Sequence, residues 1–195
     1  MKKIFGMLLA FSGFIIYSCN NNHTPAPEPG TTLSKDSLIK RGEYLVTAIG
    51  CGDCHSPKKM SPQGPVPDAE LMLSGHPATM PMPAIDTAAA KSWLLFTQDL
   101  TAFVGPWGTS FAANLTSDDS GIGKWTEAQF FTAIRQGKSK GMVNGRDLLP
   151  PMPWPNFARL SDTDLKSIFY FLKNTKPVSN VVPPPAPPQG MMGMK

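Results

Sequence analysis

The chain has 195 residues, of which 41% are hydrophobic and 16% are charged. This composition supplies enough apolar material for one ordinary core and too little charge for a disordered polyelectrolyte. The net charge of +4 comes without a run of basic residues, which argues against nucleic acid as a partner, and three cysteines are too few for a disulfide-dense scaffold.

The first 18 residues have the pattern of an export signal. Two lysines form a positive start, and the mostly apolar stretch 4–17 is too short to span a bilayer. Ser18 directly before Cys19 resembles the lipobox of bacterial lipoproteins, in which the cysteine becomes the acylated first residue of the mature chain. We therefore expect a signal peptide over 1–18 and a lipid anchor at Cys19 that holds the protein to a membrane on the periplasmic side of a bacterial cell envelope. A plain secretory signal, with Cys19 nearby by chance, is the alternative.

A tether is expected between the anchor and the folded part. Residues 20–32 contain three prolines and show no apolar periodicity, which is typical of an extended linker. We assign 19–33 to the lipidated cysteine and its flexible tether, 34–176 to a single domain, and 177–195 to a disordered tail rich in proline and methionine.

The other two cysteines lie in the sequence Cys51-Gly52-Asp53-Cys54-His55, the C-x-x-C-H signature of covalent haem attachment. Two thiols at this spacing can bond to the two vinyl groups of one haem, and the histidine that follows can bind its iron. A zinc site would need a second Cys/His pair, and a redox dithiol would need a βαβ pattern nearby. The sequence therefore predicts one covalent haem c, held by Cys51, Cys54 and His55.

Three helices are expected around this motif. The first begins at Ser34 or Asp36 and ends at Gly50, with an apolar stripe that contains Gly42, as if another helix crosses closely there. The second begins at a capping box on Thr126 and is closed by Gly137, and the third begins at Ser161 and is terminated by Pro177.

A second iron ligand is expected from a proline-rich segment, Pro150-Pro151-Met152-Pro153. Prolines on both sides fix φ and remove backbone donors, so a stiff loop presents the thioether of Met152. Met142, Met80, Met82 and His76 are the alternative ligands. An open iron site is a further alternative.

Five segments in chain order resemble a class I cytochrome c domain, and in particular the cytochrome c modules associated with membrane dehydrogenases. They are Arg41 to Val46, the C-x-x-C-H motif, Asn114 to Thr116, Gly121 to Thr126, and Pro150 to Trp154. The resemblance implies an all-α fold around one haem, with His55 and Met152 as axial ligands and electron transfer as the activity. In this family a proline carbonyl orients the proximal histidine. Pro65 is our candidate for it and Pro57 the alternative.

The stretch from residue 56 to 113 is longer than in small cytochromes. Within it, 93–97 and 100–104 have the pattern of a short β-hairpin. The sequence as a whole predicts a membrane-anchored single-electron carrier rather than an enzyme, with a dehydrogenase, an oxidase or another cytochrome as its redox partner. A haem protein with an open site, acting as a small-ligand sensor or a weak peroxidase, is the alternative.

Overall fold

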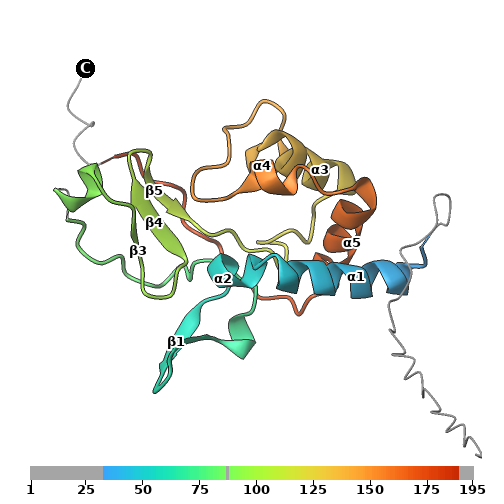
Figure 1. Ribbon diagram of the computed structural model, residues 1–195, viewed down its shortest axis with the longest axis horizontal. Helices are drawn as coiled ribbons and strands as arrows, with labels where there is room; N and C mark the ends of the chain where they lie inside the picture. The colour runs from blue at the N-terminus through green and yellow to red at the C-terminus, as the bar shows by residue number, and fades with distance from the viewer. Residues whose placement is uncertain (1–32, 87, 189–195) are drawn as a thin grey trace, which may run out of the picture. The chain divides into compact units, whose positions relative to one another are not determined.

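The computed structural model describes residues 33–86 and 88–188 (Figure 1). The predicted signal peptide, the lipidation site at Cys19 and nearly all of the tether lie outside the described residues. Within them, no helix is both long enough and apolar enough to cross a membrane.

The described chain forms five α-helices, three 3-10 helices and five strands. The α-helices are α1 Lys35–Ala48, α2 Cys51–His55, α3 Glu127–Gln136, α4 Trp154–Phe157 and α5 Asp162–Leu172, and the 3-10 helices are η1 Ala69–Leu71, η2 Ala89–Lys91 and η3 Ser139–Gly141. The strands are β1 Lys58–Ser61, β2 Gly64–Pro67, β3 Leu95–Phe96, β4 Ala102–Gly105 and β5 Gly108–Phe111.

The crossing of α1 and α5 organises the helical core (Figure 1). Gly42 is buried in α1, and a Cβ at this position would overlap the carbonyl oxygen of Ser167 in α5. Side chains from α1, α3 and α5 join with two from connecting segments, Leu73 and Ile122, in one apolar cluster. Its other members are Leu45, Val46, Phe130, Leu165, Ile168, Phe169 and Leu172. The glycine in the predicted stripe thus marks a close approach of two helices, as the sequence indicated.

The three predicted helix starts are confirmed. Ser34 and Ser161 each accept a hydrogen bond from a backbone N–H three residues on, and Thr126 forms a full capping box with Gln129. The end of α5 differs from the prediction, because the helix stops at Leu172 rather than at Pro177.

Two small antiparallel sheets correct the all-α prediction. Strands β1 and β2 form a hairpin, and β3, β4 and β5 form a three-stranded sheet in that order. The predicted hairpin of the insertion is present, with Leu95 opposite Val104 and Phe96 opposite Phe103. Neither β1–β2 nor β5 was predicted. The β1–β2 hairpin is partly or fully exposed on both faces, so no apolar alternation marks it in the sequence.

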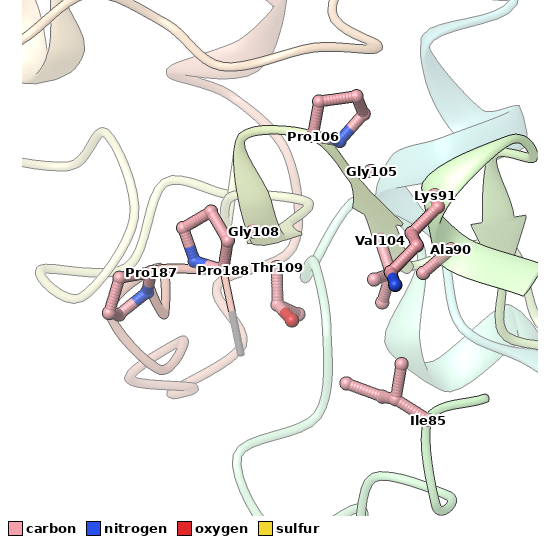
Figure 2. A pocket seen from close by; sticks show the side chains of 10 residues that line it. All are labelled: Ile85, Ala90, Lys91, Val104, Gly105, Pro106, Gly108, Thr109, Pro187 and Pro188. Carbon is pink, nitrogen blue, oxygen red and sulfur yellow. The ribbon is translucent and has the colours of Figure 1, made fainter. Parts of the chain in front are cut away.

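The segment 177–188 is packed on the domain rather than disordered. Ala186 exchanges two backbone hydrogen bonds with Thr109, of 2.8 and 3.0 Å, and thereby adds to the free edge of β5. The end of this segment borders a hollow of about 580 Å³. In Figure 2, the lining residues Pro187 and Pro188 lie on one side and Val104 and Ala90 on the other. Residues 177–188 of the predicted tail thus contact the domain, and 189–195 lie outside the described residues.

Candidate haem site

The C-x-x-C-H motif forms the short helix α2. Gly50 in a left-handed conformation, with φ of 74°, turns the chain between α1 and α2. Cys51 and Cys54 are three residues apart in the helix, which places them on one face, and both are free thiols. Burial raises the pKa of Cys51 to about 11 and raises that of Cys54 as well, so neither has the thiolate character of a redox dithiol.

The imidazole of His55 is held in one orientation by a backbone carbonyl. Its Nδ1 lies 2.7 Å from the oxygen of Ala113. A carbonyl can only accept, so Nδ1 carries the proton and the lone pair is on Nε2. Burial lowers the pKa of His55, which favours the neutral ring that a metal needs. The ring is therefore oriented as an iron ligand must be, and it is neutral.

Ala113 takes the role that we expected of a proline. The carbonyl of Pro57 accepts from the backbone N–H of Asp68. Pro65 lies in β2 and pairs with Met60. In the structure, the carbonyl that accepts from His55 is thus that of Ala113 and not that of Pro65 or Pro57. A backbone carbonyl has no side-chain signature, and the position of Ala113 directly before Asn114-Leu115-Thr116 is the one available signal.

Backbone and side-chain hydrogen bonds hold the C-terminal end of α2 in place. The carbonyl of His55 accepts from the N–H of Gly75 at 2.8 Å, and the buried Ser56 hydroxyl accepts from the N–H of Leu73 at 2.9 Å. The ammonium of Lys58 donates to the carbonyls of Asp53 and Ser56 at the end of the helix and to a third carbonyl in the insertion. A cation is favourable at a helix C-terminus, so Lys58 caps α2, a role that the sequence analysis missed.

Met152 lies half-buried in the loop that joins η3 to α4. The base of this loop is closed by the N–H of Leu148, which donates to the carbonyl of Gly137 at 2.6 Å. Trp154 lies against Gly137, where a Cβ would overlap its indole ring. The loop therefore returns to the end of α3 before the chain enters α4.

The other candidate ligands have different surroundings. Met142 is 58% exposed, and Met80 lines a surface groove together with Met60 and Phe96. Met82 is half-buried in the same proline-rich stretch as Met80. His76 is buried, bonded through Nδ1 to Thr101, and packed on the ring of Phe111 at 4.8 Å between centroids.

The donors present fit a covalently bound haem. Two free thiols on one face of a helix are followed by a neutral imidazole whose second nitrogen is already engaged. Cys51 also packs against the apolar cluster, which supplies the low-polarity surroundings that a porphyrin requires.

The chain is similar in sequence to several cytochrome c proteins. It is 32% identical over 148 residues to the gluconate 2-dehydrogenase cytochrome c subunit of Pantoea cypripedii, and 32% identical over 146 residues to the cytochrome c subunit of alcohol dehydrogenase (quinone) from Gluconobacter oxydans. It is also 28% identical over 138 residues to a diheme cytochrome c-type protein of Cereibacter sphaeroides. No family model matches the chain.

These alignments show homology to cytochrome c subunits of dehydrogenases. They cover 75%, 74% and 70% of this chain, but 25%, 23% and 36% of the respective relatives. The chain thus spans a quarter to about a third of the length of these relatives.

Proposed function

We propose that this protein is a monohaem c-type cytochrome that carries single electrons. The observation that carries the proposal is the hydrogen bond from His55 Nδ1 to the Ala113 carbonyl, within a C-x-x-C-H helix. Such a bond orients an imidazole to bind a metal, and the C-x-x-C-H spacing favours haem iron over zinc, which would need a second Cys/His pair. The homology to cytochrome c subunits supports the same function.

The residues would divide the work as follows. Cys51 and Cys54 would hold one haem c through thioether bonds, and His55 and Met152 would bind its iron. The bound haem supplies a site that accepts and releases one electron. The chain would keep the imidazole neutral and hold the methionine loop, and the apolar cluster against which Cys51 packs would help to set the reduction potential.

The partners and the location belong to the same proposal. Three of the relatives are cytochrome c subunits of gluconate, alcohol and fructose dehydrogenases, which supports a dehydrogenase as the electron donor. A lipid on Cys19 would hold the domain near a membrane partner on the periplasmic side. A contact between electron carriers of this kind is small and transient.

Replacement of Met152 by alanine tests the ligand set in protein matured with haem. The wild-type ferric protein should show the weak red charge-transfer band of methionine–iron ligation, and the ferrous protein should bind CO poorly. Met152→Ala should lose the band and bind CO readily, because one axial position is opened. Exposed Met142 is the matched control, and Met142→Ala should leave both properties unchanged.

The outcomes separate the alternatives. A pyridine haemochrome assay should give one covalent haem per chain, and an empty assay would overturn the whole proposal. Rapid CO binding by the unmodified ferrous protein would favour the open-site sensor or peroxidase. A red band that persists in Met152→Ala would assign the sixth ligand to another methionine.

A further inference from the structure

We propose that Ser110 is the positioning residue for the iron ligand Met152. The inference rests on the proposed function, since it assumes that Met152 binds the haem iron. It adds a residue from the insertion, on strand β5, to the set of groups that determine how firmly the sixth ligand is held.

The hydroxyl of Ser110 links β5 to the methionine loop. It is buried, and it lies 2.6 Å from the carbonyl oxygen of Pro150. The indole Nε1–H of Trp107 lies 3.2 Å from the same hydroxyl. An indole N–H can only donate and a carbonyl can only accept, so the single hydroxyl proton points to Pro150. The direction of the bond is thereby fixed from both sides.

This bond is important because the methionine loop has few backbone N–H groups that could donate hydrogen bonds. Pro150, Pro151 and Pro153 have no backbone N–H, and the N–H of Met152 bonds within the loop to Leu149. Among the hydrogen bonds of the described residues, only the bond from the Ser110 hydroxyl connects residues 149–152 to another element of the fold. The accepting carbonyl lies two residues before the proposed ligand.

Strand β5, which carries Ser110, is hydrogen-bonded on both edges, and the residues after it contact His55, the other proposed ligand. Ser110 is paired with Phe103 of β4, and its neighbour Thr109 is bonded to Ala186 on the opposite edge. Three residues further along, the carbonyl of Ala113 orients His55. One short segment of chain thus contacts the proximal histidine and the distal loop, so the strand relates the two ligand-bearing parts to each other.

Replacement of Ser110 by alanine should loosen the sixth ligand without removing it. In the ferric haem-loaded protein we expect the red band to weaken, and imidazole to bind about five- to tenfold more tightly, since the displaced loop loses one buried hydrogen bond of ordinary strength. Ser110→Thr keeps the hydroxyl and should restore the band. Ser167→Ala is the matched control, because Ser167 is also buried and bonded to a carbonyl, that of Thr163, within α5.

Three results would decide the matter. Weakening in Ser110→Ala, rescue in Ser110→Thr and no spectral change in Ser167→Ala would support the inference. Wild-type imidazole affinity in Ser110→Ala, with the band lost in Met152→Ala, would overturn the role of Ser110 and leave the ligand assignment intact. A band that persists in Met152→Ala would overturn both.

Discussion

At the scale of residues, the least expected feature is a buried polar chain in the insertion. The hydroxyl of Thr101 donates to the carboxylate of Asp99 at 2.7 Å and accepts from His76 Nδ1 at 2.8 Å. All three side chains are buried. Burial lowers the pKa of His76, so its ring is neutral with the proton on Nδ1. His76 is one of the alternative iron ligands that the sequence suggested, and in the structure its Nδ1 bonds to Thr101 within this network.

The stability that these hydrogen-bonded side chains give to the fold should depend on pH through Asp99. Burial alone would raise the pKa of Asp99, but the hydrogen bonds from Thr97 and Thr101 outweigh it and lower the pKa. A lowered carboxyl pKa stabilises the fold above the unfolded value of about 3.8, and this contribution is lost as the pH falls through the folded value. Asp99→Asn should therefore reduce the free energy of unfolding by ~1 kcal/mol at pH 7, and the difference should begin to shrink once the pH falls below about 4.

Thermal unfolding between pH 3 and pH 7 measures this effect. Asp119→Asn is the control, because Asp119 is an exposed carboxylate paired with Lys124 on the surface. A difference between Asp99→Asn and the wild type that stays constant over the whole range would contradict the argument.

At the scale of elements, the α1–α5 crossing depends on one missing side chain. Gly42→Ala should lower the free energy of unfolding by about 3 kcal/mol, because a methyl group there overlaps the backbone of α5 and forces the two helices apart. Chemical denaturation of the haem-loaded protein measures the loss. Glu43→Ala, an exposed change in the same turn of α1, should fall within about 0.5 kcal/mol of the wild type, and equal effects of the two changes would show that the crossing tolerates a side chain.

At the scale of the whole described domain, the segment 177–188 ties its parts together. The side-chain amide of Asn180 donates to the carbonyls of Ser74 and His76, and its oxygen accepts from the N–H of Ala78. Its backbone N–H also donates to the hydroxyl of Ser120. One residue of this segment therefore joins the insertion to the loop before α3.

Removal of that side chain should destabilise the domain. We expect Asn180→Ala to lower the free energy of unfolding by about 2 kcal/mol, since three hydrogen bonds of ordinary strength are lost and part of that loss is recovered by water. Asn174→Ala is the matched control, because the exposed Asn174 amide bonds to one carbonyl within the end of α5. Denaturant midpoints compare the two variants, and similar midpoints would show that 177–188 adds little to the fold.

The local features of the domain could be predicted from the sequence. The caps at Ser34, Thr126 and Ser161 depend on residues within one helix, and Gly42 interrupts the apolar stripe of one helix, so these patterns are visible along the chain. The end of α5 was missed because Asn174 and Thr175 bond back to carbonyls of the last turn. Such side chains compete with the helix before a proline is reached.

By itself, the sequence determined the chemistry proposed for the site, because haem attachment requires two thiols and a histidine at a fixed short spacing. The tertiary structure decided what holds those groups. His55 and Ala113 are separated by 58 residues and Ser110 and Pro150 by 40, and both contacts involve a backbone carbonyl that every residue has. No residue type marks such a partner in advance, so the folded chain alone places it.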